Sequence, residues 1–321
     1  MGGGAREGAE AGERERAGAW TARCKNSNMR RLAATVITGV FLESRTPITR
    51  TRLMKLLFLV RHETIIPSTG AFYDFLPYQY GPYSFAADRD LWELMRNGVA
   101  VGDKLQLAEW RQAEALTAYE ALGAPVRVQV RELVDRYRSW SDHQLIDHVY
   151  AKYPGYTVLS KLPGKYPSRQ VAAPAVYTLG YEGSSVDAFL RASIVHGLAR
   201  IIDVRNNPVS RRYGYSKATL LGLCDKIGVE YAHVPGLGVP SAERQSLGDA
   251  ESYSMLLDRY ERETLPRRAG DLARVSAMMR EKVSALLCFE ADAMRCHRGR
   301  LAPCVATMTG LPVCHLGVPR D

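Results

Sequence analysis

The spacing of apolar residues divides this chain into two regions of different character. Over residues 31–42 and again over 53–60, apolar side chains recur every three or four positions, which places them on one face of a helix. Thr46-Pro47-Ile48-Thr49 separates these segments and offers an N-cap to the second. Further helical segments are expected at about 85–96, 126–139 and 141–150. Residues 29–162 are therefore predicted to form a mostly helical domain.

The second region alternates short apolar runs with helical stretches. The runs have the length of buried strands and cover residues 176–180, 199–204, 230–234, 283–289 and 312–316. Ser184 or Ser185 caps the helix that follows the first run. Such alternation predicts a mainly parallel sheet flanked by helices. The expected fold class is therefore α/β, with a mostly helical N-terminal domain followed by an α/β domain over residues 176–321.

Two stretches fit neither pattern. Residues 163–175 contain three prolines, one glycine and basic residues without periodicity, which is the composition of a linker. Residues 1–28 are rich in Gly, Ala, Glu and Arg and are predicted to be a disordered arm. Because the apolar periodicity begins just after Met29, that residue is an alternative natural start.

Composition narrows the classes of protein to consider. The 43 Lys and Arg residues outnumber the 34 Asp and Glu residues, and the net charge of +9 allows a nucleic-acid or nucleotide partner without requiring one. No run approaches the ~18 apolar residues of a membrane span, and the first residues lack the apolar centre of a signal peptide. The 6 cysteines show no paired short spacing and suit a reducing compartment. A cytoplasmic protein that does not enter a membrane is expected.

Reactive side chains gather where the predicted strands end. Those that follow the run at 283–289 are Cys288, Glu290, Cys296, His297 and Arg298. The others are Tyr181 and Glu182 after the first strand, and Asp203, Arg205, Ser210 and Arg211 at or after the second. The carboxyl ends of parallel strands meet at one edge of a sheet, and neighbouring strands lie about 5 Å apart. We therefore expect these side chains to share one crevice.

Two chemical interpretations of this set stay open. In the first, Cys296 or Cys288 is a nucleophile, His297 is its base, and Asp203 or Glu290 orients the imidazole. Its substrate- and anion-binding residues are Arg205 and Arg298, which clamp an anion, together with Glu182, Tyr181, Ser210 and Arg211. In the second interpretation, Asp203 and Glu290 perform general acid/base chemistry on a sugar or glycosidic bond, and the cysteines are structural.

Two structural explanations compete with catalysis. Cys288, Cys296 and His297 could bind zinc, but their spacing is not a paired CxxC and adjacent Cys-His ligands are awkward. Neither a metal nor another cofactor is therefore expected. Asp203 and Arg205 could form only an internal salt bridge. Tyrosines interleaved with arginines between residues 177 and 253 favour a ligand with bases and phosphates, because aromatic rings stack on bases and cations pair with phosphate.

The second region resembles a known family. The motifs that carry the resemblance are Gly180-Tyr181-Glu182-Gly183, Asp203-Val204-Arg205 with Pro208 and Ser210, Leu237-Gly238, Leu287-Cys288-Phe289-Glu290 and Cys296-His297-Arg298. They occur in order, and residues 176–316 resemble the domain-of-unknown-function family 488. This resemblance implies a fold and an active site without naming an activity.

The first region resembles the SocA-like or Panacea domain. The residues concerned are Lys55-Leu56-Leu57-Phe58-Leu59, Phe75, Tyr80-Gly81-Pro82, and His148-Val149-Tyr150 before Tyr153-Pro154. Members of that family act as antitoxins or as adaptors that deliver a toxin to a protease, which implies a protein partner for residues 29–162. An alternative for the same helices is a helix-turn-helix in which Arg50, Arg52 and Lys55 meet DNA phosphates.

Two classes of function follow from these observations. In the first, the chain is an intracellular two-domain protein whose α/β domain is an enzyme acting on nucleic acid or a nucleotide. Its reaction would be that of a hydrolase or of a glycosylase or transferase that uses Asp203, Glu290, Cys296 and His297. In the second, the chain is a non-catalytic regulator, either an antitoxin or a proteolytic adaptor-like module that binds protein.

Overall fold

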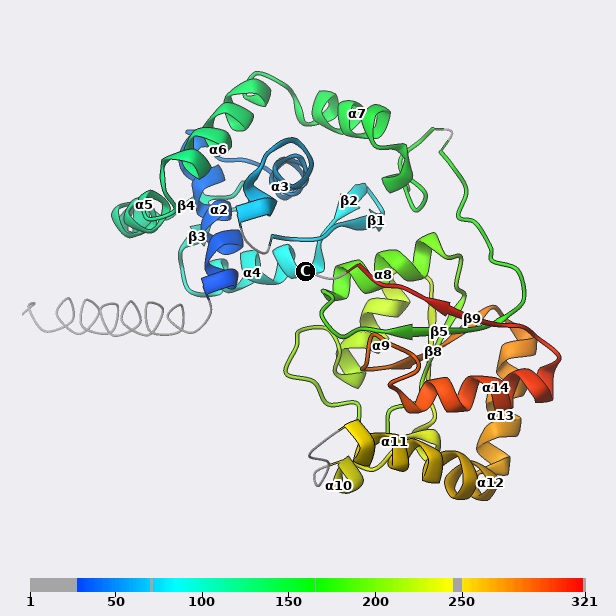
Figure 1. The fold of residues 1–321 in the computed structure, drawn as a ribbon. Coiled ribbons are helices and arrows are strands. Elements are labelled where there is room, and N and C mark those ends of the chain that lie inside the picture. Colours follow the sequence, from blue (N-terminus) through cyan, green and yellow to red (C-terminus); the bar gives the residue numbers. More distant parts are fainter. Residues whose placement is uncertain (1–27, 70–71, 165, 245–249, 320–321) are drawn as a thin grey trace, which may run out of the picture. The chain divides into compact units, whose positions relative to one another are not determined.

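The computed structural model describes residues 28–69, 72–164, 166–244 and 250–319 (Figure 1). The chain divides into two compact units, one within residues 1–75 and 79–163 and the other within residues 76–78 and 164–321. Strand β1 (Leu76–Tyr78) is grouped with the second unit. The predicted N-terminal arm lies outside the described residues, apart from Asn28. Among the described residues, none of the helices combines the length and apolar character that crossing a membrane would require.

The first unit is built mainly from helices. They are α2 (Asn28–Ser44), α3 (Arg50–Glu63), α4 (Phe85–Arg96), α5 (Gln112–Glu120), α6 (Ala124–Tyr137) and α7 (Asp142–Lys152). Short strands also occur at β2 (Gly81–Tyr83), β3 (Ala100–Val101) and β4 (Gln106–Leu107). Thr49, Ser84 and Ser141 cap α3, α4 and α7, because each side chain accepts a hydrogen bond from the first helical turn. Helix α2 packs against α5 and α6 around a shared apolar core.

Two basic residues of α3 point into the first unit. Lys55 is 2% exposed and donates hydrogen bonds to the carbonyl oxygens of Tyr80 and Pro82. Arg52 donates to the carbonyl oxygens of Trp140 and Tyr137 and pairs with Asp142. The helix-turn-helix interpretation required both side chains to reach phosphates, and it is wrong for both because the protein itself binds them. Lys55 instead holds the Tyr80-Gly81-Pro82 turn against α3.

Burial of Lys55 predicts that the stability of the first unit depends on pH. Burial lowers the pKa of Lys55 from 10.5 to about 7. Between pH 7 and 10.5, Lys55 carries a proton in the unfolded chain that it lacks in the folded one. The free energy of unfolding should therefore rise with pH over this interval. Over the whole interval the effect is roughly 5 kcal/mol, at about 1.4 kcal/mol per pH unit. Urea unfolding of the full chain between pH 6 and 9 should show this rise relative to Lys55→Met, and parallel pH profiles of the two proteins would contradict it.

The second unit is organised around a five-stranded sheet. Its strands are β5 (Val176–Gly180), β6 (Arg200–Asp203), β7 (Glu230–His233), β8 (Ser284–Cys288) and β9 (Val313–Leu316). They lie in the order β7-β6-β8-β5-β9, and every neighbouring pair is parallel. Strands β5, β6 and β8 are buried along their whole length, which explains their continuous apolar runs. The expected parallel sheet flanked by helices is confirmed.

Helices cover both faces of this sheet (Figure 1). Helices α8 (Val186–Val195) and α9 (Lys217–Lys226) follow β5 and β6, and Ser185 caps α8. Helices α13 (Ala269–Glu281) and α14 (His297–Thr309) lie on the opposite face, where they share a core with Val176, Ile202 and Leu286. The remaining helical segments between β7 and α13 are 235–237, α10 (Ser241–Arg244), α11 (Ala250–Arg259), 260–264 and α12 (Leu265–Arg267).

The chain leaves the two central strands β6 and β8 in opposite directions. The connection after β6 leads to β7 on one side, and the connection after β8 leads to β9 on the other. Crevices between the carboxyl ends of such strands are where open α/β sheets bind ligands. In the register of this pair, Asp203 lies beside Leu287, one residue before Cys288. The topology of the sheet therefore places the expected ligand site at Asp203, Cys288 and the loops that follow them.

Candidate active site at the carboxyl ends of the strands

The loop after β8 is tied to the loop after β5. The backbone N–H groups of Tyr181 and Glu182 donate to the carbonyl oxygen of Phe289, at 3.0 and 2.8 Å. The Glu182 carboxylate accepts a hydrogen bond from the backbone N–H of Ala291 at 3.0 Å. Gly180 is needed beneath this junction, because a Cβ there would lie 2.7 Å from the Glu290 carbonyl carbon. These contacts fix where the Glu290 side chain starts.

Arg298 holds the same loop from the other side. This residue is 1% exposed, and its guanidinium donates to the carbonyl oxygens of Glu290 and Ala291. The predicted role of Arg298 in an anion clamp is wrong, because the protein backbone occupies both terminal nitrogens and the side chain is buried. Arg298 positions the loop after β8 instead.

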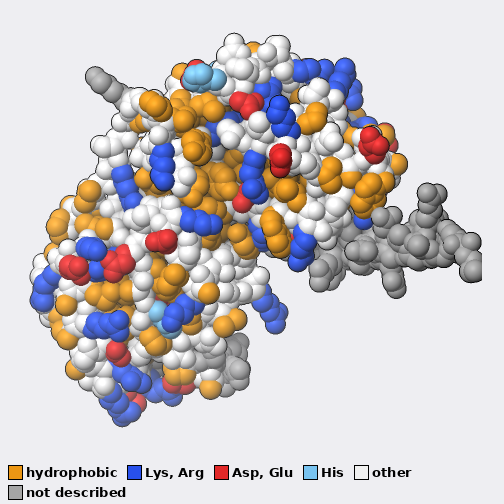
Figure 2. All heavy atoms as spheres, turned by 180° about the vertical axis from the view of Figure 1, so that it is seen from behind, with side chains coloured by type: hydrophobic (Ala, Val, Ile, Leu, Met, Phe, Trp, Pro, Cys, Tyr) orange, Lys and Arg blue, Asp and Glu red, His pale blue; other side chains and the backbone are white. Residues whose placement is uncertain are grey.

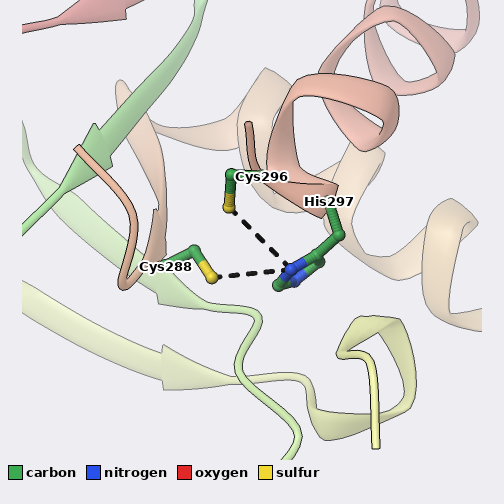
Figure 3. A group of neighbouring side chains, drawn as sticks. All are labelled: Cys288, Cys296 and His297. Atoms are coloured by element: carbon green, nitrogen blue, oxygen red, sulfur yellow. Dashed lines mark hydrogen bonds between the residues drawn. The ribbon is translucent and has the colours of Figure 1, made fainter. Parts of the chain in front are cut away.

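Three buried side chains meet where β8 ends and α14 begins (Figure 3). Cys288 is the last residue of β8, Cys296 is the N-cap of α14, and His297 is its first residue. The Sγ atoms of Cys288 and Cys296 lie 3.5 and 3.9 Å from Nδ1 of His297. Both cysteines are 0% exposed and His297 is 3% exposed. Figure 3 shows both sulfurs directed at the same ring nitrogen.

The other nitrogen of His297 fixes the orientation of its ring. Nε2 lies 3.2 Å from the carbonyl oxygen of Val204, which can only accept, so Nε2 carries a hydrogen. The ring of Tyr260 packs edge-on against the imidazole at 5.4 Å, and the Tyr260 hydroxyl donates to the carbonyl oxygen of Leu237. In the neutral imidazole, Nδ1 therefore presents its lone pair to the two sulfurs.

Glu290 borders this cluster and is half-buried. Its carboxylate accepts hydrogen bonds from the Cys288 thiol at 3.3 Å and from the Tyr253 hydroxyl at 3.1 Å. Burial raises the pKa of Glu290, but hydrogen bonds from Cys296, Cys288 and its own backbone, together with the nearby His297, lower it more. The net pKa lies below the usual 4.5, so the carboxylate is ionised at neutral pH.

Burial weighs against a nucleophilic Cys296. It raises the pKa of this thiol well above the usual 9.0, and contact with Cys288 raises it further. At neutral pH Cys296 is therefore a neutral thiol that substrate cannot reach, and the prediction that Cys296 is the nucleophile is wrong. Burial lowers the pKa of His297, but contacts with Cys296, Glu290 and the Val204 carbonyl outweigh it, so that this pKa lies above 6.5.

Asp203 and Arg205 form a buried pair beside the cluster. Nε and Nη2 of Arg205 donate to the two carboxylate oxygens of Asp203 at 2.9 and 2.5 Å. The Tyr231 hydroxyl also donates to Asp203, and Nη1 of Arg205 donates to the Tyr181 hydroxyl at 2.7 Å. Asp203 is 0% exposed and Arg205 is 5% exposed. The internal salt bridge considered from sequence is confirmed, and the anion clamp is wrong for Arg205 because its partners lie within the protein.

The structure thus brings most of the predicted residues together, including Ser210, whose side chain hydrogen-bonds to Tyr181, and leaves Arg211 apart. His297 bonds to Val204, which lies between Asp203 and Arg205, so the pair and the cluster are neighbours. Ser210 hydrogen-bonds to Ser216 and Arg212 in the loop after β6. Arg211 is exposed in that loop. Arg211 has no described contact with the cluster of Cys288, Cys296, His297 and Glu290.

Sequence reasoning missed the parts that Tyr253 and Tyr260 play at this site. Tyr253 contacts Glu290 across 37 positions of the chain, and Tyr260 packs on His297. No local pattern indicates such a contact, because it depends on how α11 and the following turn pack against the sheet. The role of Tyr231 was weakly indicated, since this residue lies in the strand that follows β6 and pairs with it. In the structure its hydroxyl donates to Asp203.

One comparison with known protein families finds a match within the second unit. Residues 185–305 match the family model described as "Domain of unknown function DUF488". This match supports the resemblance found for residues 176–316 and names no activity. No curated protein and no solved structure matches the chain. The resemblance of residues 29–162 to the SocA-like domain stays a prediction.

Proposed function

We propose that the second unit is an enzyme that acts on nucleic acid or a nucleotide, by hydrolysis or group transfer, with Glu290 as its general base. The observation that carries this proposal is the position of Glu290. Its carboxylate lies at the carboxyl edge of the sheet, half-buried, and is held by a tyrosine hydroxyl and a thiol. An ionised carboxylate within hydrogen-bond reach of a reacting group can take its proton.

The two carboxylates of the site differ in how they are paired. Asp203 is neutralised by Arg205 and is closed to solvent. Within the described part of the chain, Glu290 forms no ion pair with a lysine or arginine. The charge of Glu290 is instead stabilised by hydrogen bonds and by the nearby His297. Glu290 therefore suits chemistry, whereas Asp203 and Arg205 support the loops around it. This division favours general-base chemistry by Glu290 alone over the nucleophilic interpretation, and it counts against Asp203 as the second carboxylate of the acid/base interpretation.

An exposed aromatic ring beside Glu290 supports a substrate that contains a base. Phe289 is 43% exposed, and the Tyr181 ring packs edge-on against it at 5.3 Å. An accessible ring of this kind can stack on a nucleobase, whatever its sequence. Arg211 and Lys217 are exposed after β6 and can meet phosphates. On the face seen in Figure 2, Lys and Arg side chains are mixed with acidic and apolar ones.

A panel of ligands tests the substrate class. The purified full chain is incubated at low salt with nucleosides, nucleotides and short single- and double-stranded DNA and RNA, and both binding and product are followed, the latter by mass spectrometry. We expect binding to at least one class, with an affinity that falls steeply with salt for an oligonucleotide and only weakly for a mononucleotide. A chain that binds and converts no member of the panel would overturn the proposal.

One observation favours the regulator as a second candidate. Trp92 and Trp110 of the first unit are 53% and 58% exposed, and large exposed aromatic side chains often mark protein-binding surfaces. The SocA-like resemblance of residues 29–162 agrees with an antitoxin or adaptor role. The regulator would be favoured if the full chain neither bound nor converted any ligand of the panel but bound a protein partner. Trp92→Ser should then abolish binding to that partner.

A further inference from the structure

We propose that Cys288, Cys296 and His297 bind one thiophilic divalent transition-metal ion, with zinc as the best fit, through two sulfurs and Nδ1 of the imidazole. The ligand atoms of these three residues all lie within 4.8 Å of one another, and all three residues are buried. They come from two rigid elements, the end of β8 and the start of α14. The site is therefore formed before any ion arrives.

The spacing of the donor atoms fits tetrahedral coordination. Zinc–sulfur bonds of about 2.3 Å and zinc–nitrogen bonds of about 2.0–2.1 Å at a tetrahedral angle place sulfur and nitrogen roughly 3.6 Å apart. The two distances between sulfur and Nδ1 are 3.5 and 3.9 Å. Both sulfur–nitrogen pairs thus match one ion to within a few tenths of an ångström, and the two sulfurs, within 4.8 Å of each other, need to come to about 3.8 Å. Two thiols and an imidazole select zinc, cobalt or ferrous iron over magnesium and calcium, which prefer oxygen.

The surroundings of His297 are those of a metal ligand. A ligating histidine donates its second N–H to a carbonyl or carboxylate, which fixes the tautomer and aims the lone pair at the metal. Here Nε2 donates to the Val204 carbonyl at 3.2 Å, and the lone pair of Nδ1 faces both sulfurs. Tyr260 packs against the ring and restricts its rotation. This arrangement is independent of the spacing of the thiols and points to the same ligand set.

Glu290 lies beside the proposed ion site. Its Oε2 approaches Sγ of Cys288 at 3.3 Å, on the side of the carboxylate that Tyr253 does not occupy. Three protein ligands and one open position are the arrangement of catalytic zinc sites, where the metal lowers the pKa of a bound water and a nearby carboxylate can accept its proton. The metal site stands without the proposed function. A catalytic role for the metal beside Glu290, by contrast, rests on the proposed function. It would deepen that function, since the reaction class would then be metal-assisted hydrolysis.

Metal content of the full chain tests the site without any substrate. The chain is expressed without a histidine tag, exposed to micromolar zinc, passed through a desalting column and analysed for metal by mass spectrometry. We expect about one zinc per chain in the wild type and in Cys304→Ser, a matched control on α14 outside the ligand set. Cys296→Ser should retain less than a tenth of this amount. Glu290→Gln should retain zinc, because Glu290 is not a ligand in this proposal.

A second measurement covers the outcome in which Cys296→Ser fails to fold. Cobalt added to the metal-free wild type should produce an intense thiolate-to-cobalt band in the near ultraviolet and visible bands of tetrahedral cobalt. Wild-type chain that takes up neither zinc nor cobalt, or that contains a disulfide between Cys288 and Cys296 in place of metal, would overturn the inference. Turnover by a wild-type chain that takes up no metal would sink the metal site and leave the proposed function standing. Bound metal without turnover of any ligand in the panel would support the metal site and contradict the proposed function.

Discussion

Asp203→Asn is expected to lower the free energy of unfolding of the second unit by about 3–5 kcal/mol. The change leaves Arg205 buried at 5% exposure without the carboxylate that binds two of its nitrogens. It also places an amide against the guanidinium and removes the charged acceptor of the Tyr231 hydroxyl. Breaking a buried pair on one side costs more than the pair itself contributes, because an uncompensated charge remains in the interior.

Urea unfolding of the full chain measures this loss, with Glu243→Gln as its control. Glu243 pairs with Arg259 on the surface, where the two side chains are 39% and 51% exposed. Such pairs contribute about 0–1 kcal/mol, so the control should unfold with the wild type. The double variant Asp203→Asn with Arg205→Met should recover part of the loss, since no buried charge is left. If Asp203→Asn and Glu243→Gln lowered the free energy of unfolding equally, the Asp203–Arg205 pair would not be buried as described.

Gly180→Ala is expected to displace the Glu290 loop and to destabilise the second unit by about 3 kcal/mol or more, at the upper end of what overpacking costs. A Cβ at this position would lie 2.7 Å from the Glu290 carbonyl carbon and 2.8 Å from Nη2 of Arg298, and closer still to the Glu290 carbonyl oxygen. The nearest atoms belong to backbone, which cannot rotate away as a flexible side chain would. The loop must therefore shift, and the carboxylate of Glu290 shifts with it.

The matched control for this change is Gly222→Ala on α9. An added Cβ there meets no atom within 4 Å, and alanine stabilises a helix relative to glycine, so we expect a small gain of about 0.4–1 kcal/mol. Melting curves of both variants, together with ligand binding by the full chain, separate a local displacement from a general effect of alanine. If Gly180→Ala melted and bound ligand as the wild type does, the close contact between β5 and the Glu290 loop would be refuted.

The elements of the second unit were predictable because the sheet is buried on both faces. A parallel strand covered by helices must be apolar along its length, so the run at 283–289 contains β8 (Ser284–Cys288) and the run at 199–204 contains β6 (Arg200–Asp203). The same patterning placed α4 at 85–96 in the first unit, where Ser84 caps it. Helix α5 (Gln112–Glu120) was missed, because its apolar face consists largely of alanine and carries little periodic contrast.

The roles within the site were harder to predict, because they depend on contacts between distant segments. Arg298 follows Cys-His in the sequence, but its task is to hold backbone carbonyls eight and seven positions earlier. Cys288 and Cys296 lack the short spacing that identifies a zinc site in a sequence. They meet His297 only because the loop after β8 folds back at the start of α14. In the sequence, Lys55 has the position of a helix residue that could contact phosphate. Its burial excludes this role.

The rate of product formation by Glu290→Gln tests the proposed enzyme most directly. The substrate is the member of the ligand panel that the wild type converts, and the control is Glu251→Gln, an exposed carboxylate on the same helix as Tyr253. Loss of a general base typically costs about 10²–10⁴-fold in rate. We therefore predict a fall in kcat of that size for Glu290→Gln and none for Glu251→Gln, with both variants folded. Product formed by Glu290→Gln at the wild-type rate would contradict the account.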